Sequence, residues 1–156
     1  MAEQLEHAEK QFVVFRLGGE SYGVDIGKVK EIINMQTITA VPNTASFIEG
    51  IINLRGQVIP VFNLRSKFSL PDCEMDRQTR IMVVEVGDAA IGVIVDGVSE
   101  VLNVSSDIVE PPSPAISTNI NEDYIAGIAK FDARLVILLN LNQVMSYGRE
   151  NLTQVS

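Results

Sequence analysis

Cysteine, histidine and tryptophan are nearly absent from this chain of 156 residues, which has one Cys, one His and no Trp. Cys73 has no partner with which to form an internal disulfide, so a reducing cytoplasm is the expected compartment. His7 stands alone in a polar N-terminal stretch. Because zinc and similar metals are held by clusters of His and Cys, no such metal site is expected.

Basic residues are also scarce. The chain has 12 Lys and Arg against 20 Asp and Glu, which gives a net charge of -8, and its pI is near 4.6. Nucleic acids and anionic membrane surfaces attract basic proteins, so we expect neither as a partner. No apolar run approaches the roughly 20 residues of a transmembrane helix, and residues 1–7 lack the basic start and apolar core of a signal peptide. Direct membrane insertion is therefore not expected.

Common catalytic motifs are missing as well. No GK[ST] phosphate-binding loop occurs, and Gly18-Gly19 belongs to a predicted hairpin turn rather than to a dinucleotide-binding fingerprint. The Asp-Thr-Gly and Asp-Ser-Gly signatures of aspartic proteases are absent too. Glu31 and Glu100 occupy matched positions in the repeat described below, but both are expected to face solvent. We therefore predict a protein that is not an enzyme and needs no cofactor or metal.

Short apolar runs separated by glycines are what the chain has instead. In residues 50–64, two such runs flank the polar turn Arg55-Gly56-Gln57, a pattern that predicts a β-hairpin with a structural role for Gly56. Gly18 and Gly87 mark two similar turns. Each run of residues 50–64 is apolar on both faces, which favours a hairpin buried in a core.

This hairpin recurs later in the sequence. An offset of 77 carries the segments 48–51 and 58–64 onto 125–128 and 135–141, and an offset of 69 carries 12–35 onto 81–104. The difference, 77 − 69 = 8, falls in a connection that contains Pro111-Pro112-Ser113-Pro114. A register held in two blocks, with the slack confined to one loop, predicts an internal duplication. The approximate repeat units are residues 12–68 and 80–145.

Duplicated short strands with glycine turns predict a mainly β fold, with two small antiparallel barrels side by side. A hairpin of one repeat could close the barrel of the other, so the sequence leaves strand exchange open. Short amphipathic helical turns are predicted where apolar residues follow helical spacing, at Val29, Ile32 and Ile33 and again at Val98, Val101 and Leu102.

The predicted domain is a single unit, residues 12–147. A flexible polar arm, residues 1–11, precedes it, and a polar tail, residues 148–156, follows it. Residues 69–79 are the natural linker between the repeats. The connection 105–122 is long for a compact domain, and the sequence assigns it no role.

Four stretches carry a resemblance to a known family. They are residues 12–26, 29–32, 50–65 and 93–101, and the Asn-Leu-Arg-Gly turn of the third is the most specific. Together they resemble the CheW-like family of bacterial chemotaxis coupling proteins, and the likeness extends over residues 12–147. Three departures are small: Asn63 and Asn140 stand where the family often has Asp, and Ala133 replaces a turn residue.

The resemblance implies two SH3-like five-stranded barrels with short helical turns, and no catalysis. It also implies a cytoplasmic adaptor, monomeric when free, that couples chemoreceptor cytoplasmic tips to the regulatory domain of the chemotaxis histidine kinase CheA. Through these partners, the adaptor would associate with membrane receptor arrays. Which residues contact the kinase is not indicated.

A groove between the barrels is implied to receive the helical receptor tip. The matching positions here are Val29, Glu31, Ile32, Arg55 and Val98. We hypothesise that Glu31 and Arg55 supply the charges that fix the register of the bound helix. The alternative is that these two residues pair with each other at the surface, which would contribute little stability.

Two other functions stay open. A general signalling scaffold of the same fold would bind only one of these partners or neither. A small-molecule-binding barrel enzyme would need a deep pocket with convergent polar groups. The coupling adaptor is the function that the sequence favours.

Overall fold

The computed structural model describes residues 9–42, 44, 46–71, 74–111, 122–131 and 134–145. Its strands are β1 (Glu9–Leu17), β2 (Glu20–Asp25), β3 (Val29–Asn34), β4 (Ile48–Leu54), β5 (Gln57–Asn63), β6 (Arg80–Val86), β7 (Ala89–Val95), β8 (Gly97–Ser105), β9 (Val109–Glu110), β10 (Ile125–Phe131) and β11 (Arg134–Leu139). The helical segments are η1 (Ile26–Lys28), α2 (Leu64–Lys67), η2 (Ser106–Ile108), η3 (Glu122–Tyr124) and residues 141–145. None of the helices in this described part is long and apolar enough to cross a membrane.

Several predicted features fall partly or wholly outside the described residues. These are His7, Cys73, Ala133, the tail 148–156 and most of the connection 105–122. Strand β1 begins at Glu9, so the last three residues of the predicted arm 1–11 belong to a strand.

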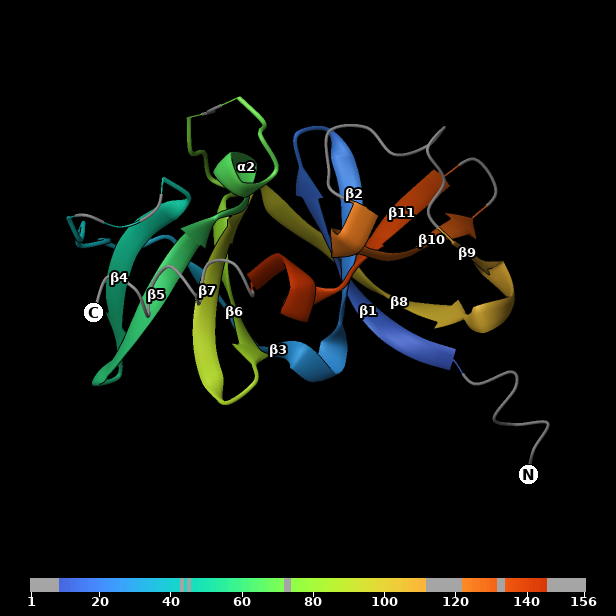
Figure 1. Ribbon diagram of the computed structural model, residues 1–156, viewed down its shortest axis with the longest axis horizontal. Coiled ribbons are helices and arrows are strands. Elements are labelled where there is room, and N and C mark those ends of the chain that lie inside the picture. The colour runs from blue at the N-terminus through green and yellow to red at the C-terminus, as the bar shows by residue number, and fades with distance from the viewer. Residues whose placement is uncertain are drawn as a thin grey trace.

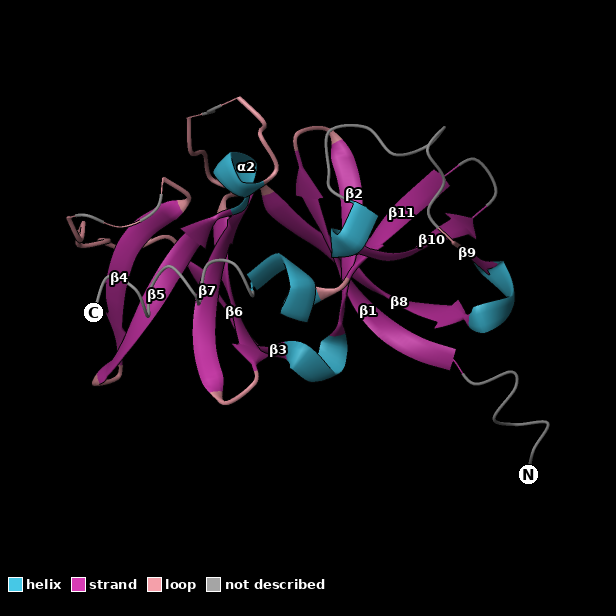
Figure 2. Cartoon of the chain, viewed as in Figure 1, coloured by secondary structure: helices cyan, strands magenta, loops and turns pink. Residues whose placement is uncertain are grey.

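The strands form two sheets that lie side by side as two SH3-like barrels (Figures 1 and 2). The first barrel has the strand order β3-β6-β7-β5-β4, and the second has β8-β1-β2-β11-β10-β9. The predicted fold class is confirmed, but the second barrel has six strands rather than five. The additional strand, β9, pairs with β10, where Glu110 lies opposite Ile128. In the first barrel, the residue that corresponds to Ile128 is Ile51, and the place of β9 is taken by a single isolated bridge from Ile51 to Thr39.

The two repeats exchange strands, the arrangement that the sequence left open. Hairpin β1–β2 of the first repeat lies between β8 and β11 of the second, and hairpin β6–β7 of the second lies between β3 and β5 of the first. The pairings match: β1–β8 and β3–β6 are antiparallel, whereas β2–β11 and β5–β7 are parallel. Each barrel therefore needs strands from both repeats.

The predicted helical turns at residues 29–33 and 98–102 are wrong, because both segments are strands, β3 and β8. A β-bulge explains the misleading spacing. The β3–β6 register skips Lys30, and the β8–β1 register skips its counterpart Ser99. One extra residue breaks the strict alternation of apolar and polar side chains that identifies a strand. Near the first of these two predicted turns, the helical residues are the three of η1, which directly precede β3.

The largest hydrophobic cluster lies between the barrels and draws on the exchanged hairpins, with Phe15 and Tyr22 from β1–β2 and Met82 and Val93 from β6–β7. The helical residues 141–145, red in Figure 1, also lie between the two barrels, and Met145 is fully buried there. A smaller cluster fills each barrel. Strands β6 and β7 are consequently covered on both faces, whereas the predicted core hairpin β4–β5 is covered only in part.

Candidate protein-binding surfaces

The β4–β5 hairpin presents Arg55 at its tip. Arg55 and Gly56 have φ values of 52° and 86°, as in the type I′ turn that matches strand twist. The Asn53 Oδ1 accepts a hydrogen bond of 2.8 Å from the Gly56 N–H, which supports the turn. Gly18 and Gly87 lie in their hairpin turns with φ values of 62° each.

Arg55 forms a bidentate ion pair with Glu31. Its Nη1 donates to Glu31 Oε1 at 3.3 Å and its Nη2 donates to Oε2. Hydrogen bonding to Glu31, together with the Glu31 negative charge, raises the pKa of Arg55. Since β3 and β4 lie at opposite ends of the strand order, the ion pair links the two edges that a closed barrel brings together. The two residues thus pair with each other, yet 69% of the Arg55 side chain stays exposed for a partner.

A surface hollow of about 260 Å³ lies where the barrels meet, and it contains two of the predicted residues, Ile32 from the first barrel and Val98 from the second. Arg16 and Arg80 also line it. We call it the inter-barrel hollow. Val29, another predicted residue, packs against the main hydrophobic cluster instead.

Sequence reasoning missed Arg16 and Arg80. No local sequence pattern marks either residue. In the structure, Gly97 leaves room for Arg16, because a Cβ at that position would overlap the Arg16 guanidinium. Arg16 Nη2 donates to Gln78 Oε1 at the edge of the hollow. Arg80 donates to the backbone carbonyls of Arg77 and Thr79 at 2.6 and 2.9 Å. The hollow therefore combines two apolar side chains, Ile32 and Val98, with two cationic ones, Arg16 and Arg80.

The second barrel repeats the exposed positions of the first. Glu100, the counterpart of Glu31, accepts a 2.8 Å hydrogen bond from Arg134 Nη1. Ile32 and Val58 are exposed in the first barrel, at 41% and 63%, and their counterparts Val101 and Leu135 are exposed in the second, at 49% and 48%. We call Glu31, Ile32, Arg55 and Val58 the first-barrel surface, and Glu100, Val101, Arg134 and Leu135 the second-barrel surface.

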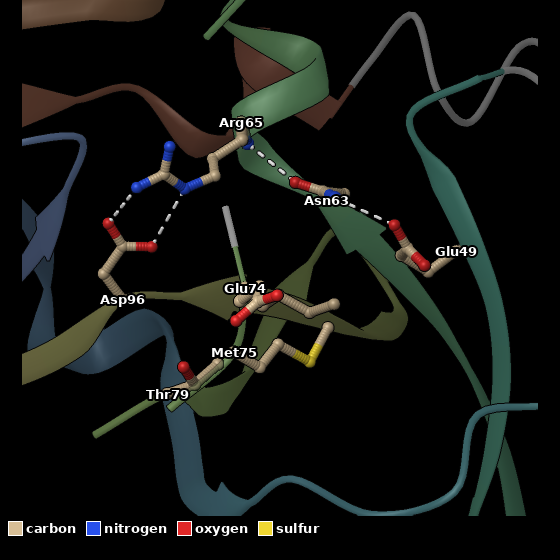
Figure 3. A pocket seen from close by; sticks show the side chains of 8 residues that line it. Glu49, Asn63, Arg65, Glu74, Met75, Thr79 and Asp96 are labelled. Atoms are coloured by element: carbon tan, nitrogen blue, oxygen red, sulfur yellow. Dashed lines mark hydrogen bonds and ion pairs between the residues drawn. The ribbon is translucent and has the colours of Figure 1, made fainter. Parts of the chain in front are cut away.

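A third ion pair, Arg65–Asp96, is more buried than the other two (Figure 3). Arg65 Nε and Nη2 donate to the two Asp96 oxygens at 3.1 and 2.6 Å, and Nη1 donates to the Pro71 carbonyl at 2.8 Å. Asp96 also accepts from the Gly18 N–H at 2.9 Å. Burial raises the pKa of Asp96, but hydrogen bonds from Arg65 and Gly18 outweigh it and leave that pKa below its usual value. This pair ties α2 to the β1–β2 turn.

Asn63 begins α2 by a side-chain cap. Its Oδ1 accepts from the Arg65 N–H at 2.9 Å, while its Nδ2 donates to Glu49 Oε1 at 2.8 Å. An ionised Asp could cap the helix but could not donate to Glu49. Asn140 likewise accepts from the Gln143 N–H at 3.3 Å, at the start of residues 141–145. Within the described residues, no group of three or more His, Cys, Asp or Glu could hold a metal ion.

The architecture and these surfaces can now be set beside known proteins. The family described as CheW-like domain matches residues 11–148. This chain belongs to that family. The resemblance inferred from the Asn-Leu-Arg-Gly hairpin is therefore confirmed.

Individual CheW-like relatives are similar over most of their length. A chemotaxis protein CheW of Klebsiella aerogenes is 35% identical over 141 residues, which cover 90% of this chain and 84% of the relative. Another, from Bacillus subtilis, is 32% identical over 145 residues, with 93% and 92% covered. The crystal structure of the scaffolding protein TtCheW from Thermoanaerobacter tengcongensis superposes with a TM-score of 0.81, at 40% identity and 88% coverage of both chains. These similarities support a scaffold or adaptor role in chemotaxis.

Proposed function

We propose that this CheW-like chain is a non-catalytic cytoplasmic adaptor that couples chemoreceptor tips to the regulatory domain of the kinase CheA. The observation that carries the proposal is the meeting of Ile32 and Val98, from different barrels, in one hollow. Residues 12–147 act as a single domain in this proposal, because strand exchange makes each barrel depend on both repeats. The adaptor acts by holding two proteins together rather than by turning over a substrate.

The inter-barrel hollow is the proposed receptor-facing surface. A helix that lies in a groove presents apolar side chains at one face and charged ones beside them. Ile32 and Val98 would contact the apolar side chains, and Arg16 and Arg80 would meet acidic ones. Arg55, which is mostly exposed beside Glu31, would fix the register of the helix.

The second-barrel surface is the proposed kinase-facing surface. It offers two exposed apolar side chains, Val101 and Leu135, on the same barrel as the Glu100–Arg134 ion pair. The family resemblance implies that the CheA regulatory domain has the same fold, so it would present strand edges of similar shape and could dock on a barrel side without remodelling. The proposed receptor-facing hollow lies where the barrels meet and contains none of the residues of the second-barrel surface, so both partners could bind at once.

Calorimetric titration of the full chain with each partner tests this proposal. Ile32→Asp and Arg55→Glu are expected to weaken binding of a receptor-tip fragment by roughly tenfold or more, as loss of a binding hot spot does. They should leave binding of the CheA regulatory domain unchanged.

The matched variants Leu135→Asp and Arg134→Glu alter the corresponding positions of the other barrel. They are expected to weaken the kinase titration and to spare the receptor titration. Equal losses for both partners in every variant would contradict separate surfaces. Absence of binding to both partners by the unmodified chain would leave only a general scaffold.

A further inference from the structure

Two hollows occupy matching places in the two barrels. The first, drawn in Figure 3, has a volume of about 180 Å³, and the second has about 290 Å³. Their linings correspond under the offsets of 69 and 77. The matched pairs are Thr79 and Lys10, Ile94 and Asp25, Glu49 and Ala126, Asn63 and Asn140, and Arg65 and Asn142.

The charges that line these hollows have opposite signs. Three carboxylates line the first hollow, and its one cation, Arg65, is ion-paired with Asp96. Lys10 and Lys28 line the second hollow with a single carboxylate, Asp25. That carboxylate accepts a 2.9 Å hydrogen bond from the Gly27 N–H as the cap of η1. Duplication has therefore produced one acidic hollow and one basic hollow from the same backbone frame.

The basic hollow has a buried apolar floor and two exposed lysines. Val24, Leu139 and Leu141 form the floor, and each is at most 6% exposed. Lys10 and Lys28 are exposed, and neither has an ion-pair partner among the residues that the structure describes. The acidic hollow differs, because Arg65 and Asp96 satisfy each other within it.

We infer that the Lys10–Lys28 hollow binds an acidic segment of a partner protein, with an apolar side chain on the floor and carboxylates beside the two lysines. Charge complementarity selects this occupant: two exposed ammonium groups attract carboxylates, and a free inorganic anion would leave the apolar floor exposed. The site shares no residue with the inter-barrel hollow or the second-barrel surface. It therefore goes beyond the proposed coupling function and stands or falls independently.

A peptide titration followed by NMR tests the inference. The probe is acetyl-Ile-Glu-Leu-Glu-amide, added to the uniformly ¹⁵N-labelled full chain, and the control is acetyl-Ile-Gln-Leu-Gln-amide. Saturable shifts are expected at the backbone amides of Val24, Leu139 and Asn142. The Gln peptide should bind more weakly, and salt should weaken the Glu peptide because exposed charges are screened.

Paired variants separate the site from general charge effects. Lys10→Gln with Lys28→Gln should weaken the Glu peptide by roughly 2- to 30-fold, as expected for the loss of two exposed ion pairs. Lys30→Gln with Lys130→Gln removes the same charge at lysines paired with Glu85 and Glu110, and should change nothing.

Three results would overturn the inference. One is the absence of saturable shifts at millimolar Glu peptide. Another is a set of shifts centred on Ile32 and Val98. The last is an equal loss of affinity in the two double variants. Because these measurements use neither CheA nor a receptor, their failure would leave the proposed coupling function untouched.

Discussion

The edges of the two barrels carry the same kind of ion pair, but they do not take its cation from the same place. Glu31 and Glu100 are matched by the repeat, whereas Arg55 corresponds to residue 132 and Arg134 corresponds to Gln57. The carboxylate is therefore fixed by its strand position, and either side of the hairpin turn can supply the arginine. The closeness of Glu100 on β8 to the start of β11, rather than sequence register, accounts for the second pair.

The segments that follow the two central hairpins differ more sharply. Lys67 of α2 corresponds to the fully buried Val144. The Lys67 ammonium lies 4.1 Å from the ring centroid of Phe47 and 5.7 Å from that of Tyr124. These rings are themselves counterparts in the two repeats, and partial burial lowers the Lys67 pKa. The repeats thus differ in sequence where both pack against the shared core. Two identical side chains, one from each repeat, could not occupy the same volume there.

The largest effect should come from truncating matched residues of the shared core. Phe62→Ala should lower the free energy of unfolding by about 3–5 kcal/mol, and its counterpart Leu139→Ala by about 2–5 kcal/mol. Urea denaturation, followed by circular dichroism, measures both. Because each barrel contains strands of both repeats, each variant should unfold in one transition. Two separate transitions in either variant would show that the barrels unfold independently.

A smaller effect should distinguish the two hollows. Arg65→Met leaves the partly buried Asp96 without its charged hydrogen-bond donor and should cost about 2 kcal/mol of unfolding free energy. The counterpart Asn142→Ala changes an exposed side chain and should cost less than about 0.5 kcal/mol. Equal costs in urea denaturation would mean that the Arg65–Asp96 pair does not stabilise the first hollow.

Acid should remove the stability that ionised Asp96 contributes to the first hollow. A carboxyl group whose pKa is lowered by folding contributes stability above its unfolded pKa, and loses that contribution as the pH falls through the folded pKa. For Asp96, the loss is expected below about pH 4. Unfolding free energies measured from pH 3 to 7 should show a deficit in Asp96→Asn that is constant near neutrality and shrinks in acid. A deficit that grows in acid would reverse the assigned direction.

The smallest effect is expected at the exposed ion pairs. Arg134→Gln should lower the free energy of unfolding by less than about 1 kcal/mol, since both partners are well exposed. Arg55→Gln should leave the thermal midpoint unchanged, because the Arg55 side chain is the more exposed of the two. Differential scanning calorimetry of both variants makes the comparison. A large loss of stability in either variant would show that its ion pair holds the barrel closed, instead of serving mainly in binding.

Part of the candidate site could be predicted from the sequence. Two of the expected receptor-binding residues, Ile32 and Val98, line one hollow, and Glu31 and Arg55 form the ion pair that the sequence offered as the alternative. Their part in receptor binding stays a prediction. Val29, another expected residue, is partly buried and packs against the main hydrophobic cluster rather than lining this hollow. The arginines of the inter-barrel hollow carry no local motif, so only the approach of β1 to β6 and β8 reveals them.

The sequence by itself determined the duplication, the β class, the family and the glycine turns, because each depends on residues close together in the chain or on a repeated register. Only the tertiary structure decided that β3 and β8 are strands, since bulges hide their alternation. It alone decided the strand exchange and the opposite charges of the two hollows. These features depend on contacts between distant segments, whose free energy comes from burial in a core that both repeats share.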